Sequence, residues 1–389
     1  MEVRVVGTQV GMKAPVMELP GIEEVQARIS HSFARSEVKQ SSQFYLKSLL
    51  DQVERKNCWQ LAEAAGEENP YGIQRLLCKA RWDADVVRDD LRAYVMEYFQ
   101  DPSAIGVIDE TGFIKQGQKS VGVQRQYSGT AGKIDNCQIG VFLNYVAPKG
   151  KAFIDRELYL PQQWAVDQVR RKEAGVPEKI QFATKPELAR SMLQRALEAG
   201  VFFSWITADT VYGNCFQLRH WLEKEKQPYV LAISSYRCIW GQDMTKRRIK
   251  KLAAEISDDD WQRLSAGEGT KGLRIYDWVW LKLPDVGEAP PAGWNRWLLV
   301  RRSIEKPEEI AYYLAAGPEN TTLVTLAEVA GKRWSVEISF EEAKGEAGLD
   351  EYEVRKWESW YRHIILSLLA HAYLAVCRLY GKEKGAMIS

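Results

Sequence analysis

The sequence predicts an α/β protein: a mixed sheet flanked by helices, preceded by an all-helical N-terminal domain and interrupted by a β-rich insertion. Three observations predict it. Apolar residues recur at three- and four-residue steps before residue 100. Short apolar segments alternate with helical ones over 101–233. Residues 234–317 hold strand-like pieces between Pro- and Gly-rich turns. The 389 residues are enough for two or three domains.

The N-terminal domain is expected to span 1–100. Its first residues, 1–20, combine Pro and Gly with little periodicity and are expected to be a loose arm. From 22 to 99 the apolar spacing is helical, with two of the helices expected at 73–80 and 85–99. We therefore expect an all-helical N-terminal domain.

The first part of the core is expected at 101–233, where a run of neighbouring strands is followed by a helix, a strand, a helix and a strand. That order indicates a mixed sheet with helices packed on it. The strands are expected at 104–109, 120–127, 135–146, 151–160, 202–209 and 229–233, and the helices at 186–200 and 216–224.

The insertion, 234–317, breaks this alternation, and the second part of the core follows it over 318–389. Strands are expected in the insertion at 273–283, 294–302 and 310–316, and helices after it at 321–330, 332–346 and 356–381.

Composition excludes several classes of protein. The net charge of +1 argues against a nonspecific polycation, but not against DNA binding, because acidic clusters offset basic patches. The six cysteines form no C-x-x-C pair, so a zinc site or disulfide framework has no support. No secretory signal pattern is present. The most apolar helix, 364–377, is too short to cross a bilayer and contains His371. We expect a cytoplasmic protein without a membrane partner.

Two aspartates stand at the ends of apolar segments. Asp109 ends 104–109 and Asp209 ends 202–209. Functional sites form at strand ends in open α/β sheets. Two carboxylates brought together there raise each other's pKa unless a cation lies between them, and Mg²⁺ suits such oxygen ligands. Each aspartate taken alone is equally well explained as a turn residue or a helix cap.

The helix expected at 332–346 adds a third acid. Arg333, Glu337 and Lys344 are spaced by four and seven residues, which places them on one helical face. The alternative is a surface ladder of ion pairs, because Glu341 and Glu342 lie on the same helix.

These residues resemble the DDE transposases of bacterial insertion sequences, in particular the branch with an Arg-x3-Glu-x6-Lys signature. Arg333, Glu337 and Lys344 match that signature without a gap. Further stretches resemble the group known as DDE-superfamily endonucleases, at 107–113, 120–127, 132–138, 155–161 and 184–189. The resemblance covers nearly the whole chain.

The resemblance implies an RNase H-like core and cut-and-paste transposition at terminal inverted repeats of double-stranded DNA. Asp109, Asp209 and Glu337 would be the catalytic residues and would hold two Mg²⁺ ions, with Mn²⁺ as a substitute. Arg333 and Lys344 would bind phosphates, and the helical domain at 1–100 would be the DNA-binding domain that recognises the inverted repeats. A homodimer would pair two DNA ends near the nucleoid, and target DNA would receive the element. Excision in this branch passes through a hairpin, but the Tyr expected three residues before the Arg is Ala330 here.

Other candidate DNA contacts are basic or aromatic. The block at 244–251 contains Lys246, Arg247 and Arg248 and is a candidate phosphate-binding strip. The resemblance also suggests a Trp in the insertion that stacks on a flipped base. Ordinary solvated charges and core packing explain these residues equally well. The further candidates are Arg35, Lys39, Arg55, Lys56 and Arg75 in the helical domain and Trp278, Trp280, Trp294 and Trp297 in the insertion.

Two other functions fit the same core. One is a domesticated, catalytically silent DNA-binding regulator, and the other is a nuclease that does not transpose. The intact set of three acids argues against the silent protein, which would have no need of all three carboxylates. An assay of strand transfer distinguishes the three functions.

Overall fold

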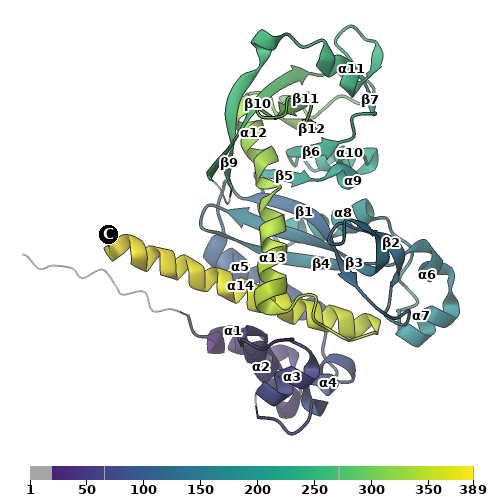
Figure 1. Ribbon diagram of the computed structural model, residues 1–389, viewed down its shortest axis with the longest axis vertical. Coiled ribbons are helices and arrows are strands. Elements are labelled where there is room, and N and C mark those ends of the chain that lie inside the picture. Colours follow the sequence, from purple (N-terminus) through teal and green to yellow (C-terminus); the bar gives the residue numbers. More distant parts are fainter. Residues whose placement is uncertain (1–19, 65, 270–271, 389) are drawn as a thin grey trace, which may run out of the picture.

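The protein is built on one large mixed sheet with helices packed against it (Figure 1). The computed structural model describes residues 20–64, 66–269 and 272–388. Residues 1–19 of the predicted N-terminal arm therefore lie outside the described residues. The predicted α/β class is confirmed, with helices before the sheet and after it.

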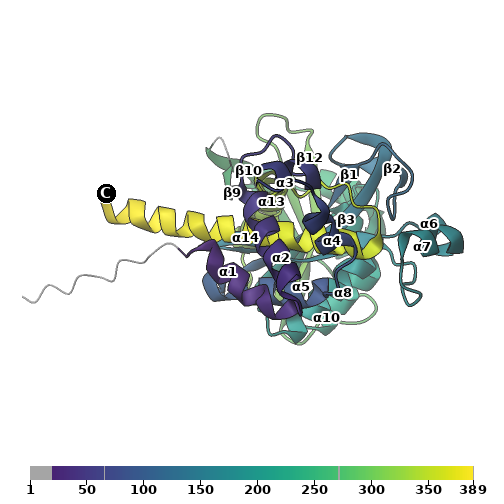
Figure 2. The same ribbon diagram turned by 90° about the horizontal axis from the view of Figure 1, so that it is seen from below.

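The N-terminal region is helical, as predicted. Asp83 caps the last of its long helices by accepting a hydrogen bond from the backbone N–H of Asp85 at 2.8 Å. Four of these helices, α1, α2, α4 and α5, pack against the C-terminal helix, far away in sequence (Figure 2). The elements are α1 (Ile22–Ile29), η1 (Ser30–Ser32), α2 (Ser36–Leu50), α3 (Cys58–Ala64), α4 (Tyr71–Cys78) and α5 (Ala84–Phe99).

The core sheet has the RNase H-like strand order β4-β3-β1-β5-β6, in which β1, β5 and β6 are parallel and β3 is antiparallel to β1 and β4. The strands are β1 (Ile105–Ile114), β2 (Gln124–Ser128), β3 (Lys133–Ala147), β4 (Gly150–Tyr159), β5 (Trp205–Ala208) and β6 (Tyr229–Ile233). The helices are α6 (Gln162–Val166), α7 (Gln168–Ala174), α8 (Lys185–Glu198), α9 (Thr210–Gly213) and α10 (Phe216–Lys224); the first two and α9 were not predicted.

The insertion extends the core sheet. Its long strands continue from β6 in the order β12-β11-β10-β9, all antiparallel to their neighbours. The three predicted strands correspond to β10, β11 and β12. The elements are β7 (Cys238–Trp240), β8 (Lys246–Arg248), α11 (Ile249–Ala254), η2 (Asp258–Asp260), β9 (Gln262–Gly269), β10 (Gly272–Lys282), β11 (Trp294–Arg302) and β12 (Ile310–Pro318).

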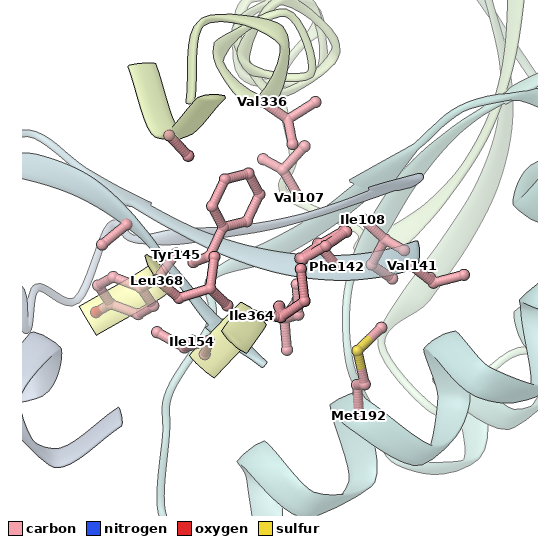
Figure 3. Close-up of a cluster of buried hydrophobic side chains, with 14 of the residues drawn as sticks. Val107, Ile108, Val141, Phe142, Tyr145, Ile154, Met192, Val336, Ile364 and Leu368 are labelled. Atoms are coloured by element: carbon pink, nitrogen blue, oxygen red, sulfur yellow. The ribbon is translucent and has the colours of Figure 1, made fainter. Parts of the chain in front are cut away.

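Three helices close the chain: α12 (Leu323–Lys332), α13 (Ser335–Ala347) and α14 (Trp357–Ile388). Val336 of α13 packs on one side of the strands and Met192 of α8 on the other (Figure 3). Both side chains are fully buried. Val107 of β1 is oriented toward Val336, so α13 lies over the odd-numbered face of β1.

The apolar helix predicted at 364–377 is part of the much longer α14, so the prediction that it is too short to cross a bilayer is wrong. The stretch Trp357–Gly381 has the length and apolar composition of a membrane span. However, 56% of its apolar 18-residue segment is buried inside the protein. Such burial is typical of a helix in the core of a folded domain.

Candidate active site

Asp109 and Asp209 lie at the same level on neighbouring parallel strands. The pairing of β1 with β5 ends at Ile108 opposite Ala208, and each aspartate is the next residue. Adjacent strands are about 4.8 Å apart. The prediction that Asp109 ends its strand is wrong, because β1 continues to Ile114; β5 ends there instead. Beyond Ile108, β1 therefore continues in pairing with β3 but no longer with β5.

The turn after Asp209 is held tightly. The Asp209 carboxylate caps α9 by accepting the Val211 N–H at 2.8 Å. Gly213 lies so close to β6 that a Cβ there would be 1.9 Å from the carbonyl oxygen of Ala232. The helix-cap interpretation of Asp209 is thus correct, and it coexists with the position beside Asp109, because a carboxylate has two oxygens.

Arg333 connects the signature helix to the strands. The predicted helix over 332–346 is divided, and Arg333 lies at the junction of α12 and α13. Its Nη2 donates to Glu337 Oε1 at 2.6 Å, and its Nη1 donates to Asp109 Oδ2 at 3.3 Å. The four-residue spacing therefore lets one guanidinium contact both Glu337 and Asp109.

The acids carry more negative charge than their surroundings neutralise. Burial is the largest cause that raises the pKa of Asp109; Arg333 lowers it, the carboxylates of Asp209 and Glu110 raise it, and the result is a pKa of about 7. Burial and Glu110 likewise raise the pKa of Asp209. A cation between the aspartates would favour their charged forms.

The donor set fits a hard cation at two of its three positions. Asp109 and Asp209 offer carboxylate oxygens side by side, the ligands that Mg²⁺ and Mn²⁺ prefer. The carboxylate of Glu337 is instead engaged by Arg333. Within the described residues, no three Asp, Glu, His or Cys side chains are grouped closely enough to hold a metal ion.

Lys344 lies along the same side of β1 as Asp109. Its Nζ donates to Thr130 Oγ1 at 3.2 Å and lies 5.9 Å from the centre of the Phe113 ring. The Thr130 hydroxyl also bonds Thr111, two residues after Asp109. Burial lowers the pKa of Lys344. The seven-residue spacing from Glu337 thus places a second cation near the strand.

Two of the predicted DNA contacts are buried. Lys56 donates to the carbonyl oxygens of Leu49 and Glu346 and is only 6% exposed, and Trp278 is 0% exposed within the sheet core. These two predictions are wrong, because neither side chain can reach a DNA surface without unfolding its surroundings. Trp297 is also buried, and its ring stacks on Trp280 at 5.6 Å.

The remaining DNA-contact candidates are exposed or half-buried. Arg55 and Arg75 are exposed and line a groove of about 1360 Å³ between the helical region and residues 350–356. Lys246 and Arg248 are exposed on β8, whereas Arg247 is ion-paired to Asp243 and Glu255. The structure places the others as follows: Arg35 is exposed, and Lys39 and Trp294 are half-buried.

Sequence reasoning missed Glu110, Tyr212 and Lys185, which form a hydrogen-bonded cluster beside the aspartates. A signal was present for all three. Glu110 and Lys185 lie in the stretches 107–113 and 184–189 that carry the family resemblance, and Tyr212 is three residues after Asp209.

An RNase H-like sheet with two aspartates at adjacent strand positions and a glutamate on a later helix defines a class of enzymes that cleave and join nucleic-acid strands. The family described as "DDE superfamily endonuclease" matches residues 28–258, more than half of the chain. The chain belongs to this family and is an enzyme that acts on DNA.

One relative and one solved structure are similar to the chain. The "Probable transposase for insertion sequence element IS701" of Microchaete diplosiphon is 23% identical over 314 residues, which cover 78% of this chain and 74% of the relative. The NurA nuclease from Sulfolobus solfataricus covers 64% of this chain and 81% of its own at 10% identity. Its TM-score of 0.28 is too low to support a conclusion.

Proposed function

We propose that this chain is a cut-and-paste transposase that binds the terminal inverted repeats of its element and performs strand cleavage and strand transfer. The observation that carries the proposal is the position of Asp109 and Asp209 at one level on parallel strands, with Glu337 linked to Asp109 through Arg333. The named relative, an insertion-sequence transposase, supports the same reaction.

In the proposed reaction, water attacks the phosphodiester at the element's end, and the bond from phosphorus to the 3′ oxygen breaks to free a 3′-OH. That hydroxyl then attacks a second phosphodiester, in the opposite strand or in target DNA, and the bond from that phosphorus to its own 3′ oxygen breaks, which leaves a new 3′-OH. Arg333 and Lys344 orient the scissile phosphate by charge-assisted hydrogen bonds. Attack on the opposite strand would give a hairpin, the route that the resemblance suggests; Ala330 offers no phenol for a phosphate contact.

Asp109, Asp209 and Glu337 are the proposed metal ligands, and Mg²⁺ is the proposed ion, with Mn²⁺ able to substitute. Two such ions, when bound, supply Lewis-acid stabilisation of the attacking and leaving oxygens. For Glu337 to take part, its side chain has to move closer to the aspartates, because the three carboxylates are not grouped closely enough to share a metal ion among the described residues, and the Arg333 guanidinium that now holds one of its oxygens has to shift. A DNA phosphate is a suitable alternative partner for that guanidinium.

The groove beside the helical region is the proposed path of the DNA backbone away from the acids. Seven basic and four acidic side chains line it, and the exposed rings of Trp59 and Tyr71 flank it. The groove begins at Ile114, five residues or about 17 Å along β1 from Asp109. That is about five base pairs of duplex.

Removing cations from this groove tests the path. Arg355→Ala with Lys356→Ala is expected to weaken binding of a terminal-repeat duplex and to lower the slope of log K against log salt by about 1.8, since each lost phosphate contact removes about 0.9. Lys149→Ala with Lys224→Ala removes two exposed cations outside the groove and should leave the slope unchanged. Equal slopes for the two double variants would contradict the path.

The triad is tested with DNA that borders the chain's own gene. Asp109→Asn, Asp209→Asn and Glu337→Gln are each expected to lose more than about 100-fold in cleavage with Mg²⁺, and to bind the duplex as tightly as the wild type. Asp259→Asn, an exposed acid in η2, is the control and should cleave normally. Full nicking activity in any of the three variants would contradict the assignment of that residue as catalytic.

The products distinguish the proposal from its alternatives. Joined strands indicate a transposase, cleavage alone indicates a nuclease, and a mobility shift without cleavage indicates a DNA-binding regulator. A paired complex with two DNA ends and two protein chains would support the proposed homodimer. Its site of action would be the nucleoid in the bacterial cytosol.

A further inference from the structure

Consecutive residues of β1 serve opposite faces of the sheet. Side chains alternate along a strand, so Asp109 points toward α13 and Glu110 toward α8. On that second face, Glu110 accepts hydrogen bonds from Lys185 Nζ at 2.6 Å and from the Tyr212 hydroxyl at 2.5 Å. The Tyr212 ring is 0% exposed. Both oxygens of Glu110 are therefore held by strong donors.

The Tyr212 end of this contact controls the turn that begins at Asp209. Asp209 caps the single turn of α9, and Tyr212 is its third residue. Gly213, immediately after it, lies directly against the backbone of β6. Burial and the Glu110 carboxylate raise the pKa of Tyr212 well above its ordinary value, so the phenol stays protonated and donates.

The Glu110 end controls Asp109, because the backbone N–H of Glu110 donates to Asp109 Oδ1 at 2.8 Å. Lys185 supplies the charge that Glu110 needs. It is the first residue of α8, whose start is fixed by a capping box between Thr184 and Glu187. Without that cation, three neighbouring carboxylates would repel one another.

We propose that Tyr212, Glu110 and Lys185 form a positioning cluster that sets the separation of Asp109 and Asp209 from the far side of the sheet. The inference rests on the proposed role of those aspartates in DNA cleavage. The three residues act through the aspartates and touch neither substrate nor metal. The cluster also gives a reason for the 184–189 stretch, which no catalytic role explains.

The chain contains a matched cluster elsewhere. Glu223 accepts hydrogen bonds from the Tyr229 hydroxyl at 2.8 Å and from Arg296 Nη2 at 2.5 Å. Tyr229 is 2% exposed, as buried as Tyr212. This second set of tyrosine, glutamate and cation joins α10, β6 and β11, and it forms no hydrogen bond or ion pair with Asp109, Asp209 or Glu337. Removal of either hydroxyl therefore breaks the same kind of bond, but only one is linked to the site.

Tyr212→Phe and Tyr229→Phe form the central comparison. Both are expected to lower Tm by a similar amount. Only Tyr212→Phe is expected to reduce kcat for cleavage of a terminal-repeat duplex, by about 10–100-fold, the usual cost of losing a residue that orients a metal ligand. The Mg²⁺ concentration for half-maximal cleavage should rise by a similar factor, while the Kd for DNA stays unchanged.

Variants of Lys185 provide a second readout. Lys185→Arg keeps the cation and should retain cleavage within about threefold of the wild type, whereas Lys185→Met should behave like Tyr212→Phe. This pair decides the matter if Tyr212→Phe does not fold. Wild-type kcat and Mg²⁺ dependence in Tyr212→Phe, or equal losses in Tyr212→Phe and Tyr229→Phe, would overturn the proposal.

A thermal-shift titration with Mg²⁺ alone separates this inference from the proposed function. If the wild type fails to cleave DNA, the proposed function is lost, but the cluster is still tested by whether Tyr212→Phe, and not Tyr229→Phe, weakens the stabilisation by Mg²⁺. Equal Mg²⁺ titrations in the two variants would refute the positioning role.

Discussion

Two pairs of carboxylates lie in the same sheet and are treated very differently. Asp155 and Glu157 of β4 share Arg195, whose Nε donates to Asp155 at 3.1 Å and whose Nη2 donates to Glu157 at 2.6 Å, and the Tyr361 hydroxyl donates to Glu157 at 2.8 Å. Among the described residues, Asp109 is ion-paired to Arg333 alone, which also pairs with Glu337, and Asp209 forms no ion pair.

The difference teaches how to separate structural from functional acids. The side chain of Asp155 is only 1% exposed, and Glu157, at 18%, has its two carboxylate oxygens occupied by Arg195 and Tyr361. The side chain of Asp109 is 15% exposed and can be reached by a ligand. For Asp155 and Glu157, ion pairs and hydrogen bonds within the protein compensate for the loss of water around the carboxylates. A shortage of positive charge at a partly open position instead leaves room for a cation from outside.

The largest expected effect comes from breaking the neutralised pair. Arg195→Met should lower the free energy of unfolding by about 3–5 kcal/mol, because it leaves the buried Asp155 and the half-buried Glu157 without their shared cation. Denaturant unfolding measures this. Arg190→Met, on the same helix and exposed, should cost less than about 1 kcal/mol. A loss as small as that for Arg195→Met would mean that the two carboxylate pairs do not differ as described.

The fold was predictable from the sequence to the extent that periodicity carried it. The alternation of strands and helices over 101–233 gives the correct core strands, and the spacing of Arg333 and Glu337 gives their contact. The continuation of the core sheet into the insertion was not predictable, because it depends on the pairing of β6 with β12, about eighty residues apart.

The candidate site was predictable as a set of acids, but not as a charge balance. Asp155-Arg156-Glu157 and Asp109-Glu110 are similar acidic motifs in sequence. Only the structure shows that Arg195 neutralises the first and that Lys185 reaches Glu110. Lys56 and Trp278 were wrongly predicted to contact DNA for a similar reason. A basic or aromatic residue type does not indicate whether the side chain points to solvent or is buried.

The next largest effect has the opposite sign, because here the substitution should stabilise the protein. In the metal-free chain, Asp109→Asn should raise the free energy of unfolding above pH 7 by about 1–3 kcal/mol. One pKa unit corresponds to about 1.4 kcal/mol, and the loss of the Arg333 contact offsets part of the gain. The native pKa is about 7 and the unfolded value about 3.9. At pH values between these two pKa values, the native state binds more protons than the unfolded state, so the stability of the wild type falls as the pH rises from about 4 to about 7.

Unfolding in EDTA at pH 4 to 8 measures this difference. The gain from Asp109→Asn should be small near pH 4 and complete above pH 7. Asp155→Asn provides the comparison and should destabilise at every pH in the window, because it breaks the ion pair with Arg195. A destabilised Asp109→Asn variant at pH 8, or a difference independent of pH, would show that Asp109 is as well neutralised as Asp155.

The smallest expected effect is the stabilisation that Mg²⁺ itself produces. If the aspartate pair lacks a cation, Mg²⁺ should raise the free energy of unfolding by about 1.4 kcal/mol at ten times its Kd, because it binds the folded chain and not the unfolded one. Asp209→Asn should abolish this gain, since one carboxylate is left to hold the ion. Asp259→Asn removes an acid from the exposed run Asp258–Asp260 and should leave the gain intact, which separates the aspartate pair from unspecific binding to acidic surface. If Mg²⁺ stabilises Asp209→Asn as much as the wild type, the shortage of positive charge at the pair is met by Arg333 alone, and the contrast with Asp155 and Glu157 loses its functional meaning.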